Sequence, residues 1–220
     1  MNIGHGPCAG CSEAYDDRPV NLEEEIASLR TAGDLRAAAT KTVEGYGPEV
    51  LGFLVTVLRD EHDASEVFSQ TCEDLWRGID AFEGRCSMRT WLYTLARHAT
   101  SRLRRAPHRR PGRHVDVSEV SELADRVRSR TLPHLRTSVK DQFAVIRDSL
   151  DEEDRALLVL YVDRSMTFRE VAFTMSPHDS EETLARLEAR LRKRYQLVKK
   201  KIRDRAREAG LLQDHSDDSN

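Results

Sequence analysis

The sequence predicts an all-α fold of two small helical domains joined by a flexible linker. Apolar residues recur at intervals of three and four, which is the spacing of one helix face, and no segment alternates convincingly as a strand does. A stretch bounded by Pro107 and Pro111 interrupts this pattern, and polar, irregular sequence follows it. The chain has 220 residues, so each half can bury a modest core of its own.

The first domain is predicted to span residues 21–106. Its helical patterns lie near residues 22–32, 35–58, 64–79 and 87–105. Ser87 can cap the last of these helices. We expect Gly45 and Gly47-Pro48 to divide the second one into two helices, because glycine and proline both interrupt helical sequence. Residues 1–20 lack periodicity and are expected to form a disordered tail.

The second domain is predicted to span residues 140–210. Asp151 and Thr167 are each placed to cap a helix, and Glu170 completes a capping box with Thr167. A long helix is then expected from about Glu181 to Ala209, before Gly210. The linker between the domains covers residues 107–139 with at most a short helix near residues 117–127, and residues 211–220 form an acidic tail.

Charge is distributed unevenly along a chain whose formal net charge is only −3. Basic residues concentrate at residues 97–113 and 190–207, whereas acidic residues collect elsewhere, including residues 60–66 and 151–154. Acidic residues are nearly absent between Arg190 and Arg203, which favours a polyanionic partner for the long helix. The pattern indicates separate surfaces for nucleic acid and for a basic protein partner.

Two sets of motifs carry a resemblance to a known family. Phe82-Glu-Gly84, Ser87-Met-Arg-Thr-Trp91-Leu92 and Arg102-Leu-Arg-Arg105 resemble the signature of the second conserved region of extracytoplasmic-function sigma factors, which belong to the sigma-70 family of bacterial RNA polymerase. Residues 150–172 resemble the start of the fourth conserved region, whose helix-turn-helix reads the minus-thirty-five promoter element. The resemblance implies a region 2 helical bundle followed by a region 4 helix-turn-helix domain, in a transcription initiation factor.

Residues 60–71 resemble the family's helix that docks on the coiled coil of the polymerase clamp. By that resemblance, the residues expected to bind core RNA polymerase are Asp60, Asp63, Glu66, Val67 and Gln70.

The segment that precedes and forms the helix at residues 87–105 is implied to contact the minus-ten element. Promoter opening requires a base to leave the stack, and in the family the loop before this helix helps to form the pocket that receives it. Gly84 and Cys86 belong to this loop. The residues expected at minus-ten DNA are Phe82, Arg85, Ser87, Arg89, Trp91, Arg97 and Arg104.

Residues 198–207 resemble the family's recognition helix, which would lie in the major groove. The segment between Phe173 and Arg192 is longer than the expected turn, so either it extends the first helix pair or the recognition helix starts earlier. The residues expected at minus-thirty-five DNA are Arg192, Lys193, Arg194, Gln196, Lys199, Lys200, Lys201 and Arg203.

The remaining motifs argue against an enzyme. The sequence has no phosphate-cradling glycine loop, nucleophile elbow or His-Glu-x-x-His segment, and we expect no cofactor. His5, Cys8 and Cys11 offer three zinc ligands where four are usual, so a metal site is the less favoured interpretation.

The expected partners are core RNA polymerase, promoter DNA and, by resemblance only, an anti-sigma protein. No apolar run reaches the length of a membrane span, and we expect a cytoplasmic protein. The alternative function is a free-standing helix-turn-helix regulator that binds duplex DNA without polymerase. Dependence on core polymerase distinguishes the two.

Overall fold

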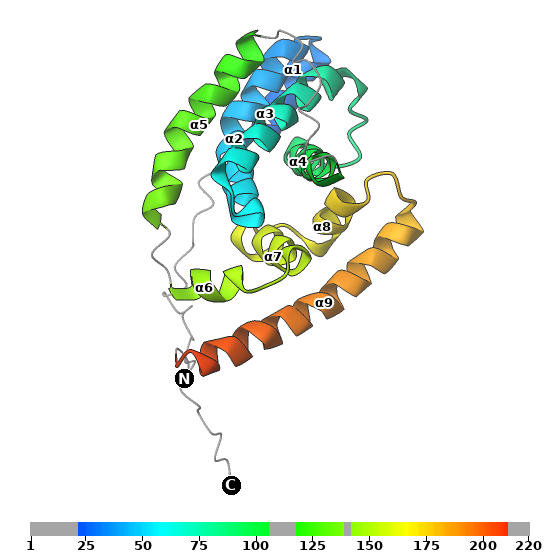
Figure 1. Cartoon of the computed structure of the whole chain (residues 1–220). Helices are drawn as coiled ribbons and strands as arrows, with labels where there is room; N and C mark the ends of the chain where they lie inside the picture. The colour runs from blue at the N-terminus through cyan, green and yellow to red at the C-terminus, as the bar shows by residue number, and fades with distance from the viewer. Residues whose placement is uncertain (1–21, 106–117, 139–141, 211–220) are drawn as a thin grey trace, which may run out of the picture.

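The computed structural model describes residues 22–105, 118–138 and 142–210, and all the regular structure in these ranges is helical (Figure 1). The first group of elements is α1 (Leu22–Thr31), α2 (Leu35–Leu58), α3 (Glu61–Gly78), the 3-10 turn η1 (Ile79–Ala81), α4 (Met88–Arg105) and α5 (Ser118–Ser138). The second group is α6 (Gln142–Asp148), α7 (Glu152–Leu158), the π-helical turn η2 (Val159–Asp163), α8 (Phe168–Met175) and α9 (Glu181–Glu208). The all-α prediction is confirmed.

Side-chain caps start several of these helices, and those of α7 and α8 lie where the sequence predicts them. The carboxylates of Asp60 and Asp151 each accept a hydrogen bond of 2.8 Å from the backbone N–H three residues later, at the starts of α3 and α7. At α8, Thr167 and Glu170 form the expected capping box. Each cap satisfies a backbone donor that has no partner within its own helix, so these residues fix where the helices begin.

The predicted division of α2 is wrong, because the helix runs unbroken from Leu35 to Leu58 with Pro48 inside it. Its glycines allow close packing instead of ending the helix. A Cβ at Gly47 would lie 3.2 Å from Cζ of Phe68 and 3.3 Å from Cγ1 of Val127, and a Cβ at Gly45 would collide with Leu22. Burial of α2 against its neighbours therefore outweighs the local cost of glycine and proline.

Part of the predicted linker is an ordered helix. Residues 118–138 form α5, which is longer than the short helix expected near residues 117–127 and lies along α2 and α3 (Figure 1). Its inner face buries Val120, Leu123, Ala124 and Val127. These residues recur at helical spacing among polar neighbours, so packing against α2 stabilises a segment whose polar composition resembles that of a linker.

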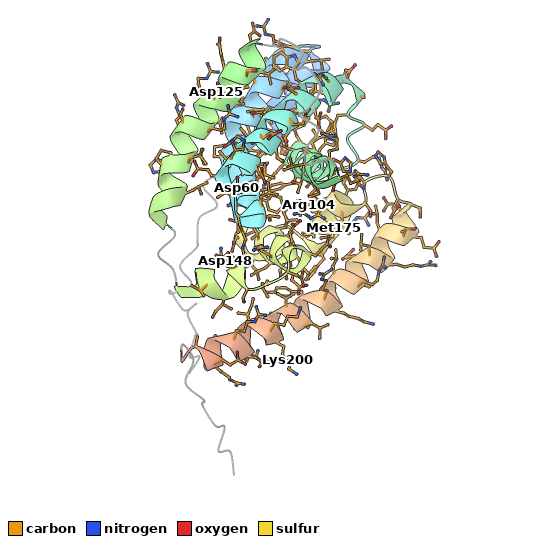
Figure 2. All side chains as sticks on the ribbon, viewed as in Figure 1. Asp60, Arg104, Asp125, Asp148, Met175 and Lys200 are labelled. Carbon is orange, nitrogen blue, oxygen red and sulfur yellow. The ribbon has the colours of Figure 1, made fainter. Side chains whose placement is uncertain are left out.

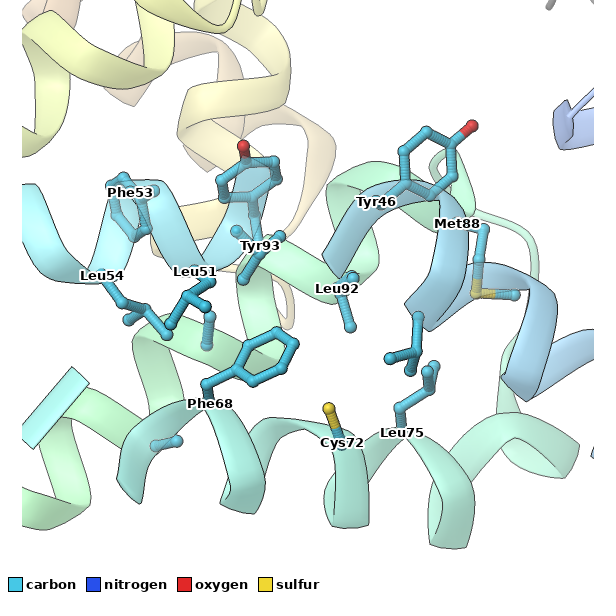
Figure 3. Close-up of a cluster of buried hydrophobic side chains, with 14 of the residues drawn as sticks. Tyr46, Leu51, Phe53, Leu54, Phe68, Cys72, Leu75, Met88, Leu92 and Tyr93 are labelled. Atoms are coloured by element: carbon cyan, nitrogen blue, oxygen red, sulfur yellow. The ribbon is translucent and has the colours of Figure 1, made fainter. Parts of the chain in front are cut away.

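The buried side chains of both groups of helices form one continuous apolar cluster, which extends from Leu22 in α1 to Leu191 in α9. Figure 3 shows part of it between α2, α3 and α4, where Phe53 and Tyr93 meet edge to face with ring centroids 5.4 Å apart. The second group docks on the first through contacts of α8 with α4 and of α7 with α2. Residues expected to lie in separate domains are thus in direct contact.

Candidate polymerase and nucleic-acid surfaces

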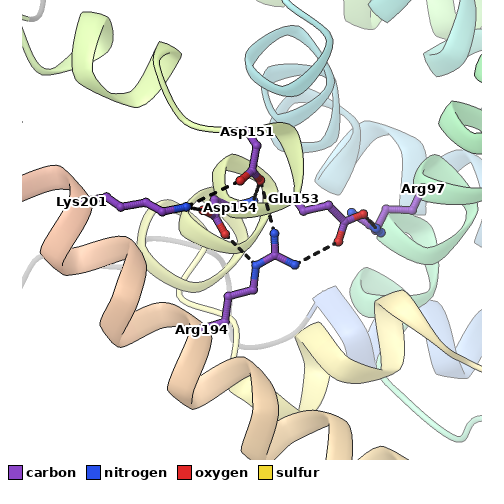
Figure 4. Close-up of polar contacts among 6 residues, drawn as sticks. All are labelled: Arg97, Asp151, Glu153, Asp154, Arg194 and Lys201. Atoms are coloured by element: carbon purple, nitrogen blue, oxygen red, sulfur yellow. Dashed lines mark hydrogen bonds and ion pairs between the residues drawn. The ribbon is translucent and has the colours of Figure 1, made fainter.

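The first turn of α7 holds α9 through a network of charged side chains (Figure 4). Asp154 accepts a hydrogen bond of 2.6 Å from Nε of Arg194 and one of 2.5 Å from Nζ of Lys201. Only 3% of the Asp154 side chain is exposed, whereas the side chains of Arg194 and Lys201 are 40% and 50% exposed, so these are charge-assisted contacts to a buried carboxylate. Asp151 and Glu153 add further ion pairs to Arg194, at 3.3 and 3.6 Å.

The two basic partners determine the ionisation of Asp154. Burial by itself would raise the pKa of this carboxyl group, but the hydrogen bonds from Lys201 and Arg194 outweigh burial and hold the pKa below its usual value. The Asp154 hydrogen bonds raise the pKa of Lys201 in turn. The carboxylate therefore stays charged in the folded protein and keeps α9 attached to α7.

The opposite face of α9 is strongly basic. Exposed side chains recur there at intervals of three and four, and Lys200 projects from it (Figure 2). They are Arg186, Arg190, Lys193, Gln196, Lys200, Arg203 and Arg207. Leu197 lies beside this stripe with 62% of its surface exposed. We refer to the seven polar residues of this set as the basic stripe.

The basic stripe overlaps only in part with the predicted minus-thirty-five residues. Lys193, Gln196, Lys200 and Arg203 lie on it, and Lys199 is exposed next to it, where its Nζ is 5.7 Å from the ring centroid of Tyr195. Arg194 and Lys201 are engaged with α7. Arg192 pairs with Glu188 at 2.5 Å, and Arg186 of the basic stripe pairs with Glu182 at the same distance. The predicted set missed Arg186, Arg190 and Arg207, although their helical spacing from Lys193 and Lys200 could have identified them.

The loop before α4 packs onto α4 itself. Phe82 lies against Trp91 with ring centroids 5.0 Å apart, and the guanidinium of Arg30 lies 4.6 Å above the Phe82 ring. The hydroxyl of Ser87 accepts a hydrogen bond of 3.1 Å from the backbone N–H of Thr90, as the predicted cap should. The aromatic residues expected at minus-ten DNA are thus held as a half-buried pair at one end of α4.

The arginines expected at minus-ten DNA all have partners, and most of these come from the second group of helices. Arg97 pairs with Glu153 at 3.7 Å and Arg104 pairs with Glu152. Arg85 and Arg89 also contact the second group of helices. Arg85 donates to the carbonyl oxygens of Pro177 and Asp179 at 3.1 and 3.3 Å. Arg89 pairs with Glu49 at 2.6 Å and donates to the carbonyl oxygen of Arg164 at 2.8 Å.

The predicted polymerase-binding residues lie on α3, but not all of them are accessible. Asp60 is exposed, and Asp63, Glu66 and Gln70 are half-buried. Gln70 also donates a hydrogen bond of 3.0 Å to Asp74. Val67 is only 2% exposed and belongs to the core. The expectation that Val67 contacts core RNA polymerase is therefore corrected. Its apolar character reflects packing between helices.

Neither the cysteines nor the acidic residues form a metal site in the part of the chain that the structure describes. Burial raises the pKa of the Cys72 thiol to about 12. Burial, and after it the negative charge of Glu23, raises the pKa of the Cys86 thiol to about 12 as well, so both cysteines favour the protonated thiol at neutral pH. His5, Cys8 and Cys11 lie outside the described residues. Among the described helices, none is long and apolar enough to cross a membrane.

Comparison with known proteins identifies similar sequences. Residues 42–110, which include most of α2 and all of α3 and α4, match the family described as Sigma-70 region 2. Two curated relatives are each named ECF RNA polymerase sigma factor SigG, from Mycobacterium tuberculosis strains CDC 1551 / Oshkosh and ATCC 25618 / H37Rv. Each is 26% identical to this chain over 161 residues.

The alignment with these relatives includes 64% of this chain and 44% of each of them, so the chain spans less than half of their length. No solved structure matches. The helical bundle and the family match define a sigma-70 region 2 domain. The match to Sigma-70 region 2 and the similarity to these two ECF sigma factors confirm the resemblance seen in the sequence.

We expect Asp154→Asn to lower the free energy of unfolding by about 1–3 kcal/mol, because the variant loses charge-assisted hydrogen bonds in a buried site. Since the pKa of Asp154 is depressed in the folded protein, its contribution is present above the usual value of 3.8 and is lost as the pH falls below it. Urea unfolding of both proteins between pH 7 and pH 3 measures this, and the difference between them should shrink at the acidic end.

The matched control is Asp125→Asn, which removes the same charge from an exposed ion pair on α5. This change should shift the free energy of unfolding by no more than about 0.5 kcal/mol. Equal effects of the two substitutions would contradict a structural role for Asp154.

Proposed function

We propose that this chain is a transcription initiation factor that binds core RNA polymerase, recognises promoter DNA through two separate surfaces and assists promoter melting. The observation that carries the proposal is the match of residues 42–110 to sigma-70 region 2, together with the basic stripe on the second helix of a helix-turn-helix. Such a factor contributes binding energy and no catalytic group, because phosphodiester synthesis belongs to the polymerase.

The pair α8 and α9 has the form of a DNA-reading helix-turn-helix, with residues 176–180 as the turn. Because α9 begins at Glu181, its geometry supports the earlier of the two starts considered for the recognition helix. The stripe presents arginines and lysines suited to phosphates and to guanine edges, and Gln196 suited to adenine. The residues at the amino-terminal half of a recognition helix usually contact bases, which favours Arg186, Arg190 and Lys193 in this role.

The bundle of α1 to α5 would bind core polymerase and hold the minus-ten strand. The acidic start of α3, with Asp60, Asp63 and Glu66, is proposed to contact basic residues of core polymerase. The loop before α4 and the arginines of α4 are proposed to hold the minus-ten strand. Because RNA polymerase operates in the cytoplasm of bacteria, that is where the protein would act. An anti-sigma partner is expected from the family resemblance alone.

The alternative of a free-standing regulator receives less support, because a region 2 domain has no role in a protein that binds only duplex DNA. The two functions differ in their dependence on polymerase. A free-standing regulator would protect its site on duplex DNA without core polymerase.

We expect the double reversal Asp63→Lys and Glu66→Lys to weaken binding to core RNA polymerase by about tenfold or more, which corresponds to about 1.4 kcal/mol. Like charges would then face each other across the proposed interface. Affinity is measured by pull-down and fluorescence titration with purified core enzyme, and promoter-dependent transcription is followed in the same samples.

The matched control carries Glu24→Lys and Glu44→Lys, two exposed reversals on α1 and α2. It should bind and transcribe like the unmodified chain. If the unmodified chain binds duplex DNA tightly but does not bind core polymerase, the proposed function is wrong and the free-standing regulator replaces it.

We expect Lys193→Ala with Lys200→Ala to reduce the slope of log affinity against log salt by about 2 for binding to duplex DNA, because each lost phosphate contact releases about one counterion fewer. Fluorescence anisotropy across a salt series measures this slope. Lys41→Ala on α2, outside the basic stripe, is the control and should leave the slope unchanged. A slope that stays constant in the double variant would exclude the stripe from the DNA contact.

A further inference from the structure

The basic stripe on α9 is longer than the stretch of helix that one major groove can hold. Helix α9 has 28 residues, and at a rise of about 1.5 Å per residue it is about 42 Å long. The stripe extends from Arg186 to Arg207, which is about 32 Å along the helix axis. The major groove of B-DNA is about 12 Å wide and winds around the duplex, so a helix that enters it leaves it again after a few turns. Part of the stripe therefore lies outside the groove when α9 reads DNA.

The carboxyl-terminal end of the stripe is the part that lies outside. Residues near the amino end of a recognition helix usually contact the bases, which places Arg190 and Lys193 in the groove. Lys200, Arg203 and Arg207 follow Lys193 at about 10–21 Å along the axis, on the same exposed face. We refer to Lys200, Arg203 and Arg207 as the distal cations. Their distance from Lys193 separates them from the residues that read bases.

The charge environment of the distal cations favours a polyanionic partner. In the amino-terminal half of α9, Arg186 pairs with Glu182 of the same helix at 2.5 Å. Within the part of the chain that the structure describes, neither Lys200 nor Arg203 has an ion-pair partner. Residues 189–203 include no acidic residue at all, whereas the exposed face of an ordinary surface helix alternates the two signs. Positive charge that is unbalanced along one helix face is typical of a surface that binds nucleic acid.

The opposite face of this half of α9 is fixed to the rest of the protein. Val198 is fully buried, and α6 packs along the helix here. Lys201 donates a hydrogen bond of 2.5 Å to Asp154, and Arg205 donates one to the hydroxyl of Ser149. These contacts hold the last turns of the helix in place before any partner arrives. A ligand of the distal cations therefore has no helix to order, which favours its binding.

We propose that the distal cations bind the phosphate backbone of the duplex that flanks the element read by α9, without contacting its bases. Because the distal cations and the base-reading residues belong to one continuous helix, placing its amino-terminal half in the groove carries the distal cations over the neighbouring phosphates (Figure 1). Lysine and arginine at phosphates supply affinity that depends on salt and not on sequence. The inference rests on the proposed function, which places α9 on duplex DNA.

The test separates the distal cations from the base-reading residues in the full chain. The distal variant is Lys200→Ala with Arg203→Ala, and the base-reading variant is Arg190→Ala with Lys193→Ala. Each protein first selects its preferred duplexes from a random-sequence pool. We expect the distal variant to select the same sequence as the unmodified chain, because it keeps the base contacts. The base-reading variant should lose that preference.

Fluorescence anisotropy then compares the selected duplex with duplexes that lack about ten base pairs, or about 34 Å, of flanking DNA on one side or the other. The unmodified chain should bind one of the trimmed duplexes at least about threefold more weakly than the full one, whereas the distal variant should bind both equally. On the full duplex, the distal variant should bind at least about fivefold more weakly than the unmodified chain. Its slope of log affinity against log salt should be lower by about 2.

The matched control is Arg126→Ala with Arg130→Ala, which removes two exposed cations from α5 and should behave like the unmodified chain. Circular dichroism checks that each variant keeps its helices. The proposal is overturned if the distal variant selects a different sequence, or if trimming the flanks weakens its binding as much as that of the unmodified chain. A distal variant that binds DNA normally but core polymerase weakly would also overturn it, in favour of an acidic protein partner.

Failure of the proposed function gives a different result. If the unmodified chain selects no sequence from the pool, promoter recognition by α9 is wrong. The distal cations are then still tested by the salt slope on a long duplex of mixed sequence, because phosphate contacts require no particular bases. An unchanged slope in the distal variant would exclude their contact with phosphates.

Discussion

The acidic first turn of α7 is the interaction on which the arrangement of the charged surfaces depends. Asp154 is almost fully buried and receives two charged donors from α9, while Glu153 reaches both Arg194 of α9 and Arg97 of α4. A buried carboxylate is tolerated only when its hydrogen bonds are satisfied, so this turn constrains α9 strongly. The same few residues determine how the basic helix is held and what covers α4.

Much of the fold follows from local rules. The helices α3, α4, α8 and α9 start where a capping residue and a three-to-four periodicity coincide, and the structure places them there. The prediction is wrong for α2, because a local reading of Gly45 and Gly47-Pro48 does not include the side chains of Leu22 and Phe68, which pack closely against these glycines. Helix α5 was underestimated for a related reason, since its four buried residues depend on packing against α2.

The candidate surfaces were harder to predict from the sequence than the fold. Charge and spacing located the basic helix, but not which of its cations face α7. Arg194 and Lys201 could be assigned only once Asp154 was seen beside them, because these partners are 40 and 47 residues apart in sequence. For Val67, the motif suggested a contact with polymerase, but its burial shows that it is a core residue. The contacts between α4 and α7 join residues whose proximity no local pattern indicates.

The docked arrangement of the free chain is tested most directly by a distance measured in solution. Spin labels at Glu122 on α5 and Arg190 on α9, both exposed, report the separation of the two groups of helices by electron–electron double resonance. The account predicts one narrow distance distribution for the free chain. A broad distribution, or several separate distances, would contradict it.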